Sequence, residues 1–400
     1  MSTLDHGRRG AALSRRALLA SASAAGAFLS LDSALAGPAA AAAPSTTAVG
    51  PTTAASAPAV ADQPTPPPIS ARTKQLAFVL SHEQFPIPDL LEFATSAERA
   101  GFDGLWTSDH IQPWQDNEGH AMMPWITLAL LGTQTHGPFF GTGVTTPTFR
   151  YDPAVVAQAF ATLGVLYPGR VFLGVGTGEA LNELAASGQF ARYQERHDRL
   201  AEAVDLIRQL WAGDHVSYAG QFYSTNNLRL YDVPSEPVPI YVAGNGPKSA
   251  RLAGQIGDGW ITTPANLATM ELHDAFREGA LAGGKNPDQL PILVEDFVVV
   301  GGEAEANEAA TYWRFAPIGF KELLYMADPR AIQERAMAEL PSPWDTWRDW
   351  TVSTDPLAHV QHIQGLWDAG ATHVFVHSGN QDQLRMLDFY AHEVIPRLSR

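Results

Sequence analysis

The sequence predicts a single (β/α)8 barrel of the α/β class. Apolar segments of strand length alternate with helical segments over about 325 residues, a length that suits this fold. The fourth strand segment runs through glycines directly into a helix, as parallel strands do at a barrel rim. We expect insertions after strands four and seven. A doubly wound sheet is the alternative, but no GxGxxG follows the first strand.

The first half of the folded chain supplies four strands. They are rich in β-branched and aromatic residues and lie at Gln75–Leu80, Gly104–Thr107, Phe140–Val144 and Val171–Val175. Helical segments at 87–100, 124–134 and 153–166 separate them. The first helix ends at Gly101 and the third begins at Pro153, which are the usual stop and start residues.

The second half continues the same alternation. A long helix is expected at 193–213, followed by a β-hairpin at 214–230 around Ala219-Gly220. The remaining strands are expected at 239–243, 259–262, 292–300 and 373–377, with helices at 248–256 and 381–398 and helix plus loop at 265–291. Residues 303–370 are predicted to be mostly helical, with interruptions at Pro341, Pro343 and Pro356.

The stretch Val171–Glu183, VFLGVGTGEALNE, organises the barrel. Its glycines let the backbone approach a ligand closely, and the following helix presents unpaired N–H groups above the strand end. Glu179 lies on the rim, where barrels place their chemistry. A strand–helix connection with a solvated glutamate is the structural alternative.

Composition excludes several function classes. Lys and Arg number 26 against 42 Asp and Glu, a net charge of −16, which argues against nucleic acid or an anionic membrane as the main partner. The chain has no cysteine, which excludes disulfides, thiolate zinc sites and cysteine nucleophiles. We expect no metal site.

The N-terminal region is predicted to be a targeting signal, not part of the fold. Residues 1–36 contain the twin-arginine pattern Ser14-Arg15-Arg16, a modestly apolar run and the small-x-small site Ala34-Leu35-Ala36. Residues 37–72 form an Ala/Pro/Thr-rich linker, and residues 73–400 form the barrel. We therefore expect export by the twin-arginine (Tat) machinery to the cell envelope or outside the cell. Because this pathway carries folded proteins, the signal also hints at a bound cofactor.

Several chemically active side chains follow the strand ends, which converge on one mouth in a barrel. Asp109 and His110 form a carboxylate–imidazole neighbour pair able to share a proton near neutral pH. Trp114 offers an aromatic face, and Glu179 offers an acid. Each of these could be structural alone, but their coincidence at strand ends favours an active site.

Four segments then carry a resemblance to a known family. They are SDHIQPW at 108–114, TPTFRY at 146–151, the 171–183 stretch, and YDVP at 231–234. Together they resemble the F420-dependent glucose-6-phosphate dehydrogenase family of the luciferase-like (β/α)8 superfamily, over about residues 75–400.

The resemblance implies that the deazaflavin coenzyme F420 lies across the barrel mouth. Asp109 would contact the deazaflavin ring, and Gly143–Val144 matches a non-proline cis peptide of the family. Further positions that match cofactor-binding residues of the family are Thr146, Gly176, Thr177, Gly178, Asn182, Ala243, Gly244, Asn245, Gly246 and Pro247. The last five match the turn near the phosphate-bearing tail of the cofactor.

The implied reaction is hydride transfer from a carbinol carbon to C5 of the deazaflavin. His110 would accept the hydroxyl proton, Glu179 would protonate the reduced cofactor, and Trp114 would stabilise positive character at the carbon. Glu83 would line the same pocket.

The chain departs from the family where basic side chains hold the substrate phosphate. Two of those positions fall at Asn266 and Asp349, and Lys321 is out of register with the third. A phosphate would lose charge-assisted hydrogen bonds of about 1.5–3 kcal/mol each. Apolar residues such as Phe320 and Trp344 suit a lipid-like group instead. The chain therefore resembles the exported F420-dependent hydroxymycolic acid dehydrogenases, which oxidise a secondary alcohol on a mycolic chain to a ketone.

Other functions stay open at this point. The same fold could run in reverse as a reduced-F420-dependent reductase of a ketone or activated alkene, or oxidise another sugar or alcohol. An FMN-dependent monooxygenase and a non-catalytic binding protein are further alternatives. Related barrels commonly dimerise, and nothing in the sequence argues against a homodimer.

Overall fold

The computed structural model describes Ile69 and residues 73–400. The predicted signal peptide at 1–36 and all of the predicted linker except Ile69 lie outside the described residues. No helix among the described residues has the length and apolar character that crossing a membrane requires.

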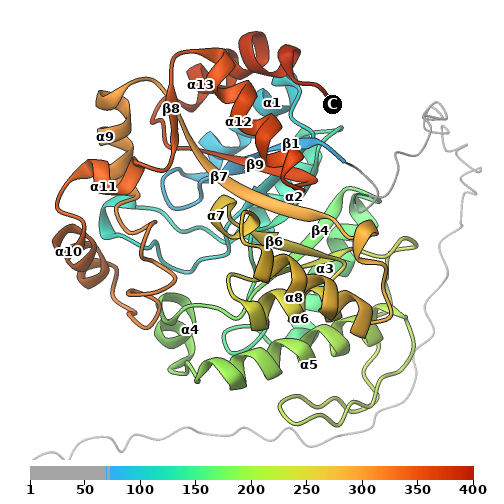
Figure 1. Cartoon of the computed structure of the whole chain (residues 1–400). Helices are drawn as coiled ribbons and strands as arrows, with labels where there is room; N and C mark the ends of the chain where they lie inside the picture. The colour runs from blue at the N-terminus through green and yellow to red at the C-terminus, as the bar shows by residue number, and fades with distance from the viewer. Residues whose placement is uncertain (1–68, 70–72) are drawn as a thin grey trace, which may run out of the picture. The chain divides into compact units, whose positions relative to one another are not determined.

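Eight parallel strands close into a barrel, which confirms the predicted fold (Figure 1). In barrel order they are β1 (Gln75–Leu80), β2 (Gly104–Thr107), β3 (Phe139–Thr142), β4 (Val171–Val175), β5 (Ile240–Ala243), β6 (Gly259–Thr262), β7 (Ile292–Val300) and β9 (His373–Ser378). Closure comes from the pairing of β1 with β9 and of β9 with β7.

Helices surround the barrel on the outside (Figure 1). The helices up to β5 are α1 (Ile87–Ala100), α2 (Pro124–Gln134), α3 (Pro153–Leu166), α4 (Ala180–Ser187) and α5 (Tyr193–Trp211). Those after β5 are α6 (Pro247–Ile256), α7 (Pro264–Leu267), α8 (Met270–Ala282), α9 (Glu303–Tyr312), α10 (Pro329–Glu339), α11 (Pro343–Trp347), α12 (Pro356–Asp368) and α13 (Gln383–Phe389). Short 3-10 turns lie at Asp116–Glu118, Pro287–Gln289 and Ile395–Arg397, with a π turn at Tyr390–Val394.

Three details differ from the sequence prediction. The third strand ends at Thr142 instead of Val144, and the cis peptide bond expected between Gly143 and Val144 follows it and is confirmed. Within the segment expected to be helical, β8 (Thr351–Ser353) pairs with the far end of β7. The expected hairpin at 214–230 is antiparallel, but it forms isolated bridges instead of regular strands.

The barrel interior is packed, so a ligand site has to lie above it. Along β1, Leu76 and Phe78 face the surrounding helices, whereas Ala77 and Val79 belong to the interior cluster. That cluster is Ile69, Ala77, Val79, Trp106, Phe139, Phe172, Tyr241, Ile261, Leu293 and Phe375. At its centre the rings of Trp106 and Phe375 stack 4.0 Å apart. Of this cluster, Val79, Trp106 and Ile261 line the cavity described below and form its floor.

Candidate active site

A cavity of about 730 Å³ lies above this floor, at the carboxyl ends of the strands. Loops after almost every barrel strand contribute to its wall, as the strand-end rule predicts. The predicted site residues that line it are Glu83, His110, Trp114, Gly143, Val144, Gly176, Thr177, Gly178, Glu179, Ala243, Gly244, Asn245, Gly246 and Pro247. The fold therefore brings these residues to one place.

His110 and Glu83 form a buried ion pair on one wall. His110 Nδ1 lies 2.8 Å from Glu83 Oε1, and the two side chains are 14% and 4% exposed. Burial alone would lower the pKa of His110, but the Glu83 carboxylate outweighs it, so this pKa lies above its usual value. Burial would likewise raise the pKa of Glu83, but His110, with Ser108 and His82, holds it down at about 2. The Glu83 carboxylate therefore stabilises the imidazolium that forms when His110 accepts a proton.

Asp109 lies behind the wall and does not line the cavity. Oδ2 accepts hydrogen bonds from Thr145 at 2.6 Å and Trp125 at 3.1 Å, and Oδ1 accepts from Arg150 at 3.0 Å and Tyr151 at 3.1 Å. Because protein donors occupy both oxygens, this carboxylate ties the loops after β2 and β3 together. The structure thus places Asp109 outside the cavity lining, and its contact with the deazaflavin ring stays a prediction.

Thr146 and Asn182 also lie outside the cavity lining, and Asn182 supports a residue inside it. Asn182 Nδ2 donates to Glu179 Oε2 at 3.4 Å, and its Oδ1 accepts from the Ile111 backbone N–H at 2.9 Å. Asn182 therefore links the acid at the start of α4 to the loop that carries His110.

The glycine turns form a cradle of backbone that packs too closely against its neighbours to allow side chains. Gly178 has φ +76°, and a Cβ there would lie 2.8 Å from Thr146. A Cβ on Gly244 would lie 2.8 Å from the Ser249 backbone. The backbone of these turns lines the cavity directly, beside the start of α6.

Arg196 is a cavity residue that the sequence analysis missed. It comes from α5, is 1% exposed, and its NH1 donates to the Gly178 carbonyl at 2.8 Å and the Thr177 carbonyl at 3.2 Å. Its Nε has no hydrogen-bond partner among the described residues. Together with Lys248 at the start of α6, it makes this side of the cavity basic. A planar ligand with an anionic tail, such as a deazaflavin cofactor, fits a cradle of this kind.

The opposite side of the cavity is aromatic. Trp114 stacks on Phe315 with ring centroids 4.8 Å apart and meets the edge of Phe320 at 5.8 Å. Phe297 stacks on Trp350 at 4.8 Å. All five rings line the cavity, so a substrate here meets apolar surface.

The positions that depart from the sugar-phosphate pattern carry no cation in this cavity. Asp349 lines the cavity and its side chain is 88% exposed. Asn266 is outside the lining and donates to Asn245 Oδ1 at 2.9 Å. Lys321 is also outside the lining. Among the residues that line the described cavity, the only Lys and Arg are Lys248 and Arg196, on the cradle side.

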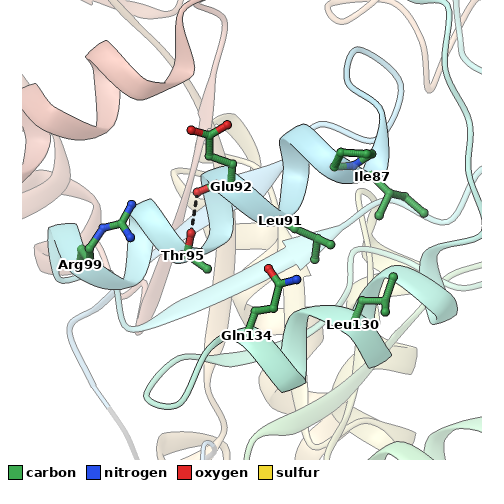
Figure 2. A pocket seen from close by; sticks show the side chains of 8 residues that line it. Ile87, Leu91, Glu92, Thr95, Arg99, Leu130 and Gln134 are labelled. Carbon is green, nitrogen blue, oxygen red and sulfur yellow. Dashed lines mark hydrogen bonds between the residues drawn. The ribbon is translucent and has the colours of Figure 1, made fainter.

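A second hollow lies apart from this site, between α1 and α2 (Figure 2). It is open, has a volume of about 680 Å³ and shares no lining residue with the cavity. Leu91 and Leu130 supply apolar surface there, while Glu92 accepts a hydrogen bond from Thr95 through its backbone carbonyl. It offers no acid–base pair.

The chain is a (β/α)8 barrel with a ligand-sized cavity at the carboxyl ends of its strands. The model of the luciferase-like monooxygenase family matches residues 69–371, and the chain belongs to this family.

Relatives of known activity are similar over most of the chain. F420-dependent hydroxymycolic acid dehydrogenase of Mycobacterium tuberculosis is 48% identical over 335 residues, covering 84% of this chain and 90% of that protein. F420-dependent glucose-6-phosphate dehydrogenase of Nakamurella multipartita is 41% identical, covering 84% and 98% respectively. An F420-dependent secondary alcohol dehydrogenase, solved in complex with an F420-acetone adduct, superimposes with a TM-score of 0.76 at 32% identity. That likeness covers 82% of this chain and 100% of the solved one.

Proposed function

We propose that this protein is an exported F420-dependent dehydrogenase that oxidises a secondary alcohol to a ketone, with a hydroxymycolic acid as the substrate. The observation that carries the proposal is the cavity itself. A buried His110–Glu83 pair and an aromatic wall face the same space as a glycine-rich, basic cradle. The relatives that share this fold at 32–48% identity are F420-dependent dehydrogenases.

The cradle suits coenzyme F420. The turns at Gly176–Gly178 and Gly244–Pro247 would hold the ring and the tail, with Arg196 and Lys248 facing the anionic tail. Bound there, the deazaflavin supplies the carbon that accepts a hydride from the alcohol.

His110 is the base that takes the hydroxyl proton. Its Nδ1 faces Glu83, which leaves Nε2, the other ring nitrogen, for the substrate hydroxyl. Glu83 stabilises the imidazolium that forms when the proton arrives, as its effect on the pKa of His110 indicates. Glu83 thus acts through His110 instead of on the substrate.

Glu179 supplies the second proton-handling group. It lines the same cavity, at the residue before α4, and Asn182 orients one of its oxygens. Separate groups are needed because a hydride leaves carbon while a proton leaves oxygen. The aromatic face of Trp114 lies on the substrate side, where it favours positive character on the reacting carbon.

The cavity charges support a neutral, lipid-like substrate over a sugar phosphate. Asp349 would repel a phosphate where the sugar-phosphate dehydrogenases place a cation, and the surrounding rings favour an alkyl chain. The test is to compare glucose 6-phosphate with long-chain secondary alcohols and hydroxymycolate, and to run the ketones in reverse with reduced F420. If glucose 6-phosphate reduced F420 and none of the long-chain alcohols did, the substrate proposal would be contradicted. We expect Asp349→Arg to raise the relative activity on glucose 6-phosphate.

Export rests on the N-terminal pattern. Arg15-Arg16 precede a modestly apolar run and the Ala34-Leu35-Ala36 site. A Lys-Lys replacement of the arginine pair should keep the protein in the cytoplasm, whereas the unchanged chain reaches the envelope fraction. Equal export of both forms would contradict this part of the proposal.

A further inference from the structure

A second histidine–carboxylate pair faces the cavity, on the aromatic wall. His377 Nδ1 lies 2.8 Å from Glu295 Oε1, and both residues line the cavity. The side chain of His377 is 4% exposed, while that of Glu295 is 33% exposed. The pair comes from neighbouring strands, β7 and β9. The acid–base roles assigned above do not use it.

Hydrogen bonds and ring contacts within the protein fix the position of His377. His377 Nε2 lies 2.8 Å from Ser81 Oγ, so both ring nitrogens have partners. The His377 ring stacks on Phe297 at 4.2 Å and meets Trp313 edge-on at 4.3 Å. With its nitrogens and faces occupied, His377 is placed to fix Glu295 instead of exchanging protons with a substrate.

One oxygen of Glu295 is left for the cavity. Oε1 faces His377, whereas Oε2 has no hydrogen-bond partner among the described residues. The rings of Phe297, Trp313 and Trp350 line the cavity beside it. Besides Glu83 and Glu179, two further carboxylates line the cavity, but Asp296 lies 2.8 Å from His362 and Asp349 lies 3.6 Å from Arg348. An oriented oxygen without a protein partner, beside aromatic rings, can select a substrate because a matching donor gains a charge-assisted hydrogen bond.

We propose that Glu295 is a specificity residue that accepts a hydrogen bond from a second hydroxyl on the alcohol substrate. A hydroxyl suits this wall better than an ammonium, because one O–H donor matches one acceptor while an ammonium brings three N–H donors. The inference rests on the proposed function, since it names a further group on the substrate of that site.

The test compares three kinds of ligand built on the same carbon chain. They are a straight-chain secondary alcohol, the diols with a second hydroxyl at successive carbons, and the methyl ethers of those second hydroxyls. Two readouts are used: the kcat/KM for F420 reduction, and binding to the F420-free protein by saturation-transfer NMR. We expect the unchanged protein to prefer at least one diol over its ether and over the mono-alcohol by about tenfold.

Glu295→Gln provides the diagnostic variant. If the amide oxygen keeps the contact with His377, the amide N–H2 faces the cavity and presents a donor where Oε2 was an acceptor. The preference of diol over ether should then fall by about tenfold, because an ether oxygen can accept from the amide. Glu271→Gln, which removes an exposed carboxylate on α8, is the matched control and should keep the original preference.

The outcomes separate this inference from the proposed function. Equal treatment of diols, ethers and mono-alcohols by the unchanged protein overturns the role of Glu295, even if secondary alcohols are oxidised. An unchanged diol preference in folded Glu295→Gln overturns it as well. Selective binding of a diol without oxidation of any alcohol supports the inference and contradicts the proposed function.

Discussion

Replacing Glu83 by Gln tests the acid–base assignment most sharply. In the folded protein the Glu83 carboxylate holds the pKa of His110 above its usual value, against the effect of burial. Glu179 also raises this pKa and Arg150 lowers it. His110 has to be neutral to accept a proton, so activity should fall on the acidic side of its pKa. In Glu83→Gln the burial effect remains without its main counterweight, and the acidic limb should move to lower pH.

The size of the rate effect follows from the lost charge. The imidazolium formed during the reaction loses a carboxylate 2.8 Å away in a nearly buried pair. A charge-assisted hydrogen bond of this kind contributes about 1.5–3 kcal/mol, so kcat should fall by about tenfold to a hundredfold.

The assay is F420 reduction by a secondary alcohol, with kcat and kcat/KM measured across the pH range for both proteins. Binding of F420, followed by fluorescence quenching, serves as the control because Glu83 faces the substrate side. An acidic limb that stays in place or moves to higher pH would refute the role given to the pair.

Three further predictions concern the surrounding framework. Burial raises the pKa of Glu183 to about 7 from its usual 4.5, so the stability that it contributes should be full below pH ~4.5 and lost as the pH rises through ~7. Chemical denaturation at a series of pH values should show this loss, up to about 3 kcal/mol, in the unchanged protein but not in Glu183→Gln. An equal dependence of the unfolding free energy on pH in both proteins would contradict the prediction. Asp109→Asn removes the charge of one of the two carboxylates beside buried Arg150, which keeps Glu183 at 3.5 Å, and should lower the free energy of unfolding by about 1–3 kcal/mol in the same denaturation assay. Gly178→Ala, at φ +76°, should cost about 1–2 kcal/mol and weaken F420 binding; unchanged melting and affinity would count against the cradle.

The strand-end rule predicted much of the site, but not which way each side chain points. Asp109 and His110 are consecutive, yet His110 enters the cavity and Asp109 turns to Thr145 and Arg150 behind the wall. Successive side chains of an extended segment point to opposite sides, so adjacency after a strand does not place both in one site.

The residues that sequence reasoning missed come from other places. Arg196 reaches the cavity from α5, where it resembles any charged residue of an amphipathic helix. Glu295 lies inside β7 instead of after it, because this strand continues beyond the rim. The three residues of β8 are too few to show a period, and only their pairing with β7 makes them a strand.

The most direct test of the central claim is titration of the purified protein with F420, followed by addition of a long-chain secondary alcohol. We predict that F420 fluorescence is quenched at a single site and that the deazaflavin absorbance then falls as the ketone accumulates. FMN should produce no comparable binding. Tight binding of FMN together with no quenching of F420 would contradict the account.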